Sequence, residues 1–270
     1  MVLLSHEYLK ITYLRTVFMD KELTTLFTGR KLIGLAETVS TNRYLNELMQ
    51  HEQVPEGTVV TTNYQTDGQG LGGTAWFSEP GSNLLMSVLF RPDFLPVPKI
   101  YLISKAIALA IKDFLNDQGI PAKIKWPNDI YIDDNKICGV LIENSLRGSQ
   151  VLQSVCGIGL NVNQQIFPPG IPNPVSMKMI TGKTYSVDEC LAVLCRQLEK
   201  RYLQIKSQNF NHINNDYLKS LFRFYEMKSF ETASEKFNAQ IIDVEDDGRL
   251  VLKKENGTIQ RFVFKEIRFL

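Results

Sequence analysis

Two lysines and an aspartate are the side chains best suited to chemistry in this sequence. Residues 125–129 read Lys-Trp-Pro-Asn-Asp, and Lys136 follows at the start of a β-favouring run. Lysines neutralise anions, and a nearby carboxylate orients or accepts a proton. If Lys125, Asp129 and Lys136 meet at the mouth of a sheet, they would suit transfer chemistry at a phosphate or carboxylate. The alternative is a β-turn with both lysines facing solvent.

A glycine-rich loop over residues 64–76 is the second candidate site. Gly68, Gly70, Gly72 and Gly73 are costly in chain entropy, and they let backbone amides approach a phosphate closely. No Gly-Lys-Ser/Thr follows, so the loop is not a Walker loop, and it lacks the strand-to-helix setting of a dinucleotide fingerprint. Alone it indicates an anion site or a flexible hinge.

The third candidate is a helix start at residues 40–42, Ser-Thr-Asn, ahead of apolar residues at helical spacing. Taken alone, these residues are a helix N-cap. The unpaired N–H groups and the positive dipole end of a helix also suit an anion or a small polar ligand.

Composition excludes several classes of protein. The chain is 44% hydrophobic and 22% charged, which is typical of a globular protein. Its net charge of +1 gives no overall positive potential that would attract nucleic acid or an anionic membrane. No apolar run reaches the roughly 20 residues of a membrane span, and no secretory signal is visible. The expected location is therefore the cytoplasm. Four cysteines and three histidines lack metal-ligand spacing, which argues against zinc and histidine-based catalysis.

The elements that must position these candidates are mostly strands. Residues 58–62 and 83–90 read as strands around the glycine loop, and residues 102–115 as a helix that ends at Gly119. Short β-favouring runs separated by turns then predict antiparallel hairpins, at residues 124–126, 130–132, 137–143 and 151–162.

The last part of the chain changes from helices to strands. Ser186 begins a capping box and a helix to about residue 205, with another helix over 213–223. Tight-turn signals then separate three strand-like runs, at residues 237–244, 250–254 and 260–264. We expect a domain of residues 1–225 and a small β-barrel-like domain of residues 226–270.

These runs together resemble biotin–protein ligases of the biotin/lipoate ligase family. The order and spacing of residues 40–42, 125–129, 136–143 and 157–163 are those of the family, over roughly residues 33–270. The resemblance implies an α/β (α+β) fold with a mixed, largely antiparallel sheet flanked by helices, like class II aminoacyl-tRNA synthetases, plus an SH3-like C-terminal β-barrel. It also implies an ATP-dependent biotin–[acetyl-CoA-carboxylase] ligase that forms biotinyl-5'-AMP and pyrophosphate and transfers biotin to a lysine of a biotin carboxyl carrier domain.

The resemblance implies roles for single residues. Lys136, Lys125 and Asp129 would be catalytic, and Mg2+ would arrive with ATP, with Asp129 or Asn128 as a donor and no fixed metal site. Biotin would contact Ser40, Thr41, Asn42, Gln65, Gly68, Lys136 and Gly139. ATP and the adenylate would contact Gln69, Gly70, Leu71, Trp76, Asn128 and Asn161.

The sequence departs from the family in the glycine loop. The family's loop usually reads Gly-Arg-Gly-Arg, whereas Gln69 and Leu71 stand at the arginine positions here. Charge-assisted hydrogen bonds contribute about 1.5–3 kcal/mol each, so we expect weaker retention of the adenylate unless another cation compensates. Arg43 is one candidate.

Other functions remain open on the residues alone. A lipoate ligase or octanoyltransferase shares the fold and the lysine, and a silent biotin or adenylate sensor or a scaffold would tolerate the altered loop. Some thirty residues precede the resemblance, too few for a winged helix, so we expect no DNA binding. Homodimer formation stays open.

Overall fold

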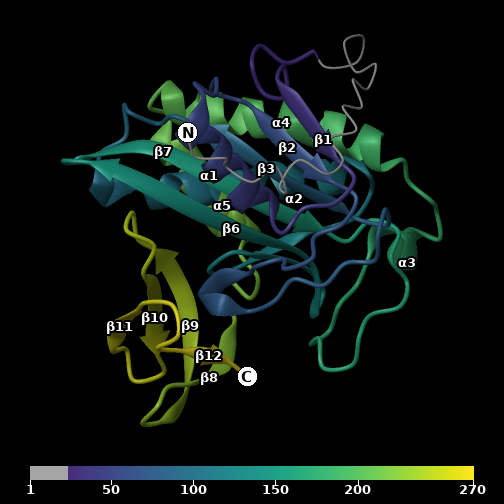
Figure 1. Cartoon of the computed structure of the whole chain (residues 1–270). Helices are drawn as coiled ribbons and strands as arrows, with labels where there is room; N and C mark the ends of the chain where they lie inside the picture. The colour runs from purple at the N-terminus through teal and green to yellow at the C-terminus, as the bar shows by residue number, and fades with distance from the viewer. Residues whose placement is uncertain (1–23) are drawn as a thin grey trace, which may run out of the picture.

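The computed structural model describes residues 24–270 as two β-sheets with helices packed on the larger one (Figure 1). The expectations about an N-terminal winged helix and a secretory signal concern residues that lie mainly outside this range. No helix within residues 24–270 is long and apolar enough to cross a bilayer.

The larger sheet has seven strands in the order β1-β2-β3-β7-β6-β5-β4. Only β1 and β2 pair in parallel, and the other neighbours are antiparallel, which confirms the predicted mixed, largely antiparallel sheet. The strands are β1 (Leu32–Leu35), β2 (Val59–Thr62), β3 (Leu84–Phe90), β4 (Lys123–Lys125), β5 (Asp129–Ile132), β6 (Asn135–Arg147) and β7 (Gln150–Leu160).

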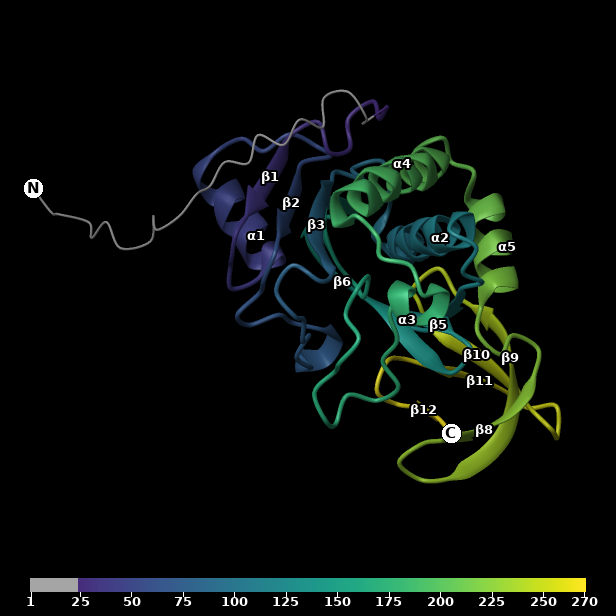
Figure 2. The ribbon, with the colours of Figure 1, turned by 90° about the vertical axis from the view of Figure 1, so that its right-hand side faces the viewer.

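Helices cover both faces of this sheet. Figure 2 shows α1 (Thr41–His51) on one face and α2 (Tyr101–Asp117) and α4 (Val187–Lys206) on the other. Side chains alternate along a strand, so neighbours in β2 divide between two cores. Val60 joins the cluster under α1, whereas Val59 joins the large core under α2 and α4. The site residues on α1 and on the central strands therefore share one face.

The remaining helices are α3 (Met177–Thr181) and α5 (Phe210–Ser220). The predicted N-cap of α4 is confirmed, because the Ser186 hydroxyl accepts a hydrogen bond from the Glu189 N–H at 3.3 Å. The helix predicted at residues 213–223 lies three residues earlier, since Leu221 already has an extended backbone.

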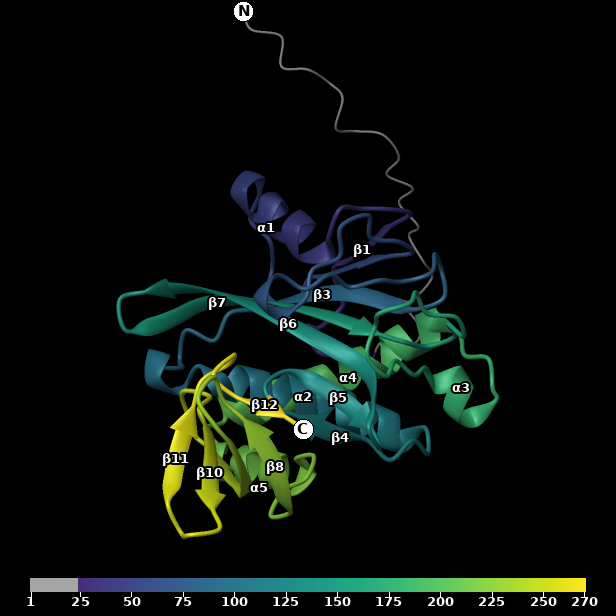
Figure 3. The ribbon, with the colours of Figure 1, turned by 90° about the horizontal axis from the view of Figure 1, so that it is seen from below.

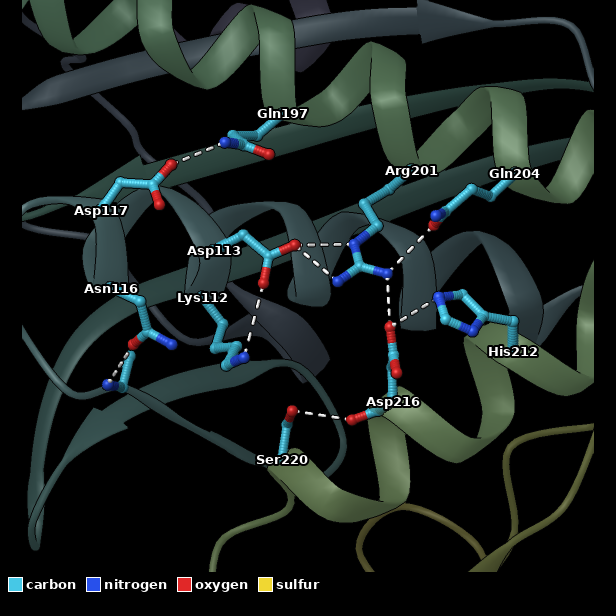
Figure 4. Close-up of polar contacts among 11 residues, drawn as sticks. Lys112, Asp113, Asn116, Asp117, Gln197, Arg201, Gln204, His212, Asp216 and Ser220 are labelled. Atoms are coloured by element: carbon cyan, nitrogen blue, oxygen red, sulfur yellow. Dashed lines mark hydrogen bonds and ion pairs between the residues drawn. The ribbon is translucent and has the colours of Figure 1, made fainter.

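One buried arginine ties α2, α4 and α5 together. Figure 4 shows Arg201 of α4 between Asp113 of α2 and Asp216 of α5, with N···O distances of 2.6 and 2.7 Å. The side chain of Arg201 is 8% exposed. Burying a charged side chain costs free energy unless the charge is paired, so the two carboxylates offset the cost of burying Arg201.

The second sheet is the small C-terminal β-sheet that was predicted, but it is open and does not close into an SH3-like barrel. Its order is β11-β10-β9-β8-β12, and no ladder joins β11 to β12 within residues 24–270. β11 ends at Phe262, and a tight turn at residues 263–266 follows it. β12 is therefore only two residues long, and it pairs with β8. The strands are β8 (Met227–Glu231), β9 (Lys236–Val244), β10 (Leu250–Lys254), β11 (Ile259–Phe262) and β12 (Arg268–Phe269).

The two sheets meet at the Trp-Pro-Asn turn between β4 and β5. The Trp126 indole donates to the Gly248 carbonyl of the β9–β10 turn at 2.8 Å. The Tyr101 hydroxyl of α2 donates to the Pro127 carbonyl at 2.7 Å, and the buried Lys105 ammonium donates to Val244 at 2.7 Å. Figure 3 shows the smaller sheet lying beneath α2 and β6. The turn that carries Asn128 is thus held from both sides.

Candidate active site

A cleft on the α1 face of the large sheet collects most of the predicted site residues. It is bounded by the start of α1, the glycine loop, the β4–β5 turn and the middle of β6 and β7. Its lining includes Ser40, Thr41, Asn42, Gln65, Gln69, Gly70, Leu71, Trp76, Asn128, Lys136 and Gly139. Gly68, Lys125, Asp129 and Asn161 are predicted residues outside the lining.

A buried polar cluster forms the α1 end of the cleft. The Gln65 carboxamide oxygen accepts hydrogen bonds from the Thr41 N–H at 2.8 Å and the Thr41 hydroxyl at 3.1 Å. Ser40 is the N-cap of α1, but its side chain makes no cap hydrogen bond, so Gln65 takes over that function. The loop that carries Gln65 is therefore attached to the helix start.

Ser87 belongs to this cluster, and the sequence reasoning missed it. Its hydroxyl lies 2.7 Å from Thr41 Oγ1 and 2.6 Å from Asn42 Oδ1. The Asn42 amide in turn donates to Glu143 Oε2 at 2.8 Å. The available signal was a single serine within the otherwise apolar strand Leu84–Phe90, because a polar residue at a fully buried strand position needs a partner.

Glycines at three strand positions let large side chains lie on the sheet, and two of them were not predicted. A Cβ on Gly159 would lie 2.5 Å from the Trp76 indole, and one on Gly139 would lie 3.0 Å from it. These two glycines are directly paired between β6 and β7. A Cβ on Gly157 would meet Asn42 Oδ1 at 2.5 Å. The floor of the cleft is thus bare backbone, which only glycine allows.

Lys136 and Asp129 form the charged centre of the site. The Lys136 ammonium lies 2.7 Å from Asp129 Oδ1, and both side chains are between one fifth and one third exposed. Asn128 is anchored beside them, because its amide donates to the Val140 carbonyl at 2.6 Å. The ammonium also lies 5.7 Å from the centroid of the Trp76 ring. A cation, a carboxylate and an aromatic ring therefore lie close together at this side of the cleft.

Lys125 does not join this pair in the structure, contrary to the expected convergence. Its ammonium donates to the Tyr131 hydroxyl at 3.2 Å and lies 4.3 Å from the centroid of that ring. Phe222 and Phe269 lie within 6 Å of it on the side of the second sheet. Burial among these rings lowers the pKa of Lys125. Its neighbour in the β4–β5 ladder is Asp129, but its side chain does not line the cleft.

Two predicted adenylate residues hold buried polar atoms that lack partners. The Trp76 indole N–H and the Asn161 side-chain oxygen make no hydrogen bond to the described residues. The Asn161 amide donates to the Val175 carbonyl at 3.0 Å, which fixes the orientation of that side chain. Leaving such a group unpaired costs about 1–3 kcal/mol, so the Trp76 N–H, which belongs to a residue of the lining, is suited to pairing with a ligand. Asn161 lies outside the lining, and its contact with the adenylate stays a prediction.

The glycine loop is held in a compact form by its own backbone. Gly70 N–H donates to Thr74 O at 2.6 Å, and Trp76 N–H donates to Gly68 O at 2.8 Å. A Cβ on Gly68 would lie 2.9 Å from Gln65 Nε2, so Gly68 supports Gln65 from behind the cleft. Gln69 donates to Asp67 at 2.7 Å. Arg43 is exposed and does not line the cleft.

Comparisons with known proteins agree with this arrangement. The sequence profile of the Biotin/lipoate A/B protein ligase family matches residues 28–161. The bifunctional ligase/repressor BirA of Bacillus subtilis (strain 168) is 30% identical over 244 residues, which cover 87% of this chain and 73% of that protein. A biotin–[acetyl-CoA-carboxylase] ligase of Paracoccus denitrificans is 29% identical over 205 residues, which cover 73% of this chain and 85% of that protein.

The fold is similar to a solved biotin protein ligase from Aquifex aeolicus in complex with biotin and ATP. The TM-score is 0.74 at 25% identity, over 89% of this chain and 100% of that one. The glycine floor, the polar cluster at the helix start and the Lys136–Asp129 pair all lie within residues 28–161, which the family profile matches. The chain therefore belongs to the biotin/lipoate A/B protein ligase family.

Proposed function

We propose that this protein is a biotin–protein ligase, which activates biotin with ATP and transfers it to a lysine of a biotin carboxyl carrier domain. The observation that carries the proposal is the Lys136–Asp129 pair, which lies beside the Thr41–Gln65–Ser87 cluster. The cluster would bind the polar ring of biotin and the pair would act at its carboxylate.

The first half-reaction brings a carboxylate to a phosphate. A biotin carboxylate oxygen attacks the α-phosphorus of ATP, the bond to the β-phosphate oxygen breaks, and pyrophosphate leaves. Repulsion between the two anions is the main obstacle, so a positioned cation matters more than a nucleophilic side chain. Lys136 would leave Asp129 for the α-phosphate, and the freed carboxylate would then be available to the acceptor.

The second half-reaction needs a neutral amine. The carrier lysine attacks the carbonyl carbon of the adenylate, the bond to the phosphate oxygen breaks, and AMP leaves. Asp129 is the carboxylate best placed to orient the amine and accept its proton. Lys125 would have to leave Tyr131 to reach a phosphate, so its catalytic role stays a prediction.

Biotin is favoured over lipoate by the polarity of the buried end of the cleft. Ser40, Thr41 and Asn42 are each less than 10% exposed, and Ser87 is fully buried. A cyclic urea offers donors and an acceptor to such groups, whereas the disulfide ring of lipoate would leave them unpaired at a cost.

Mg2+ would enter with the triphosphate. Residues 24–270 contain no group of three or more His, Cys, Asp or Glu side chains placed to hold a metal. A cation carried by phosphate oxygens needs only one or two protein donors, and the Asp129 carboxylate and Asn128 fit that demand. A cytoplasmic address and homodimer formation stay predictions.

Intact-mass measurement tests the proposal. The protein is mixed with biotin, MgATP and a biotin carboxyl carrier domain, in parallel with the Lys136→Ala variant and with Lys123→Ala, which removes an exposed lysine of β4. We expect the mass of one biotin to be added by the wild type and by Lys123→Ala, and not by Lys136→Ala. A parallel reaction contains lipoate instead of biotin. Addition of lipoate without any addition of biotin, or no addition and no pyrophosphate from wild type, would contradict the proposal.

A further inference from the structure

The cleft has few cations for a substrate as anionic as ATP. Lys136 is the one Lys or Arg among its lining residues, and its charge is offset by Asp129 at 2.7 Å. No Lys or Arg occurs in the sequence from residue 44 to residue 90, and the glycine loop is flanked by Asp67 and Glu79. A triphosphate bound under this loop would meet backbone amides and neutral side chains, with Lys136 as the one cation of the lining.

Lys265 of the second sheet reaches the outside of the glycine loop. Its ammonium lies 3.3 Å from the Gly72 carbonyl oxygen, across 193 residues of sequence. A Cβ on Gly72 would lie 2.8 Å from Lys265 Cε and 3.0 Å from Phe264 Cε1, so this loop position requires glycine for the contact. Gly72 follows Leu71, which lines the cleft. The ammonium is therefore at the rim of the site.

The turn that carries Lys265 has an unusual residue choice. Glu266 N–H donates to Val263 O at 3.2 Å, which closes a tight turn, and Val263 N–H donates to Glu266 Oε2 at 2.9 Å. Lys265 has φ of +74° at the third position, where glycine or asparagine is preferred. Lys265 is one of six non-glycine residues with a positive φ among the described residues, and this backbone turns its side chain toward Gly72.

Lys265 also has a charge that no acid offsets. It forms no ion pair with the described residues, and its polar partner is a neutral carbonyl. Two other cations of this region already form ion pairs, Arg268 with Glu231 and Arg223 with Asp134. An exposed lysine has a flexible stem, so its ammonium can turn from Gly72 toward an anion beneath the loop.

We propose that Lys265 is a phosphate-binding residue of this ligase, which closes on the glycine loop from the second sheet and supplies the cation that the loop itself lacks. The inference rests on the proposed function, because the phosphate is that of ATP and of the adenylate. It makes the C-terminal sheet part of the nucleotide site. It also names a compensating group for the uncharged Gln69 and Leu71.

Biotin-dependent exchange of labelled pyrophosphate into ATP tests this role without a carrier. We compare wild type with Lys265→Gln, Lys265→Arg, Lys265→Gly and Lys253→Gln, the last of which removes an exposed lysine from β10 of the same sheet. We expect Lys265→Gln to raise the KM for ATP about tenfold and to speed release of the adenylate about tenfold, with the KM for biotin unchanged. Lys265→Arg and Lys253→Gln should stay within about twofold of wild type.

Lys265→Gly separates binding from a structural role of the turn. Glycine accepts the positive φ, so this variant should melt no lower than wild type and still show the raised KM for ATP. If Lys265→Gln and Lys265→Gly exchange like wild type, the inference is wrong. It is also wrong if a separate transfer assay shows that only the KM for the carrier rises. If wild type itself shows no biotin-dependent exchange, the proposed function fails, which is a different result.

Discussion

The indole of Trp76 lies directly on Gly159, where a Cβ would come within 2.5 Å of the ring. The ring also covers Gly139 on the neighbouring strand, so one aromatic side chain from the glycine loop lies over both central strands of the site. Its position depends on the absence of two side chains. The loop and the sheet are thus matched at this contact, and the match can be tested.

Gly159→Ala should displace Trp76 without unfolding the protein. Because a shift of about 1 Å at a site can cost about 100-fold in rate, we expect kcat/KM for ATP in pyrophosphate exchange to fall by about that factor. A double-mutant cycle with Trp76→Ala is the control. If the substitution acts through the indole, Gly159→Ala should have little further effect once the ring is gone.

Ser87→Ala should weaken biotin binding selectively. It removes a buried donor from Thr41 and Asn42, at a cost of about 1–3 kcal/mol, which corresponds to a KM for biotin that is roughly 5-fold to 150-fold higher. The KM for ATP should not change. Ser154→Ala is the matched control, because Ser154 is also fully buried in this sheet but pairs with Asn144. Equal effects of the two variants on biotin would refute a binding role for Ser87.

Arg201→Met should destabilise the helical layer. The substitution leaves Asp113 and Asp216 without their shared cation, and breaking a buried pair costs about 3–5 kcal/mol. Urea unfolding measures this change. Lys31→Met breaks the exposed pair with Glu52 and should cost less than about 1 kcal/mol. A similar small loss for Arg201→Met would show that its network contributes little.

Cys190 should make stability fall at alkaline pH. Burial, assisted by the Glu189 carboxylate, raises the pKa of this thiol from 9.0 to about 11. Below pH 9 both states keep the proton. Between pH 9 and 11 the unfolded chain loses it first, so the free energy of unfolding falls, by at most about 3 kcal/mol from this group.

Urea unfolding of Cys190→Ala under reducing conditions isolates this contribution. The difference in unfolding free energy between wild type and variant should be constant up to pH 9 and should then shrink or reverse toward pH 11. A difference that stays constant over the whole range would show that the thiol titrates normally in the folded protein.

The sequence by itself determined the features that a few neighbouring residues encode. Three features lie where they were predicted: the start of α1 at Thr41, the N-cap at Ser186 and the strand Leu250–Lys254. They were predictable because capping hydrogen bonds, turn residues and hydrophobic periodicity act over short distances. The family motifs were also readable, since each is a contiguous run.

Only the tertiary structure decided which side chains meet. Lys136 and Asp129 pair, but Lys125 turns to Tyr131. Phe269 of the second sheet also lies on that side of the strand. Ser87 contacts Thr41 and Asn42 of α1, but the sequence of its strand indicates only that the strand is buried. The open second sheet and the approach of Lys265 to Gly72 depend on long-range packing, which no local pattern records.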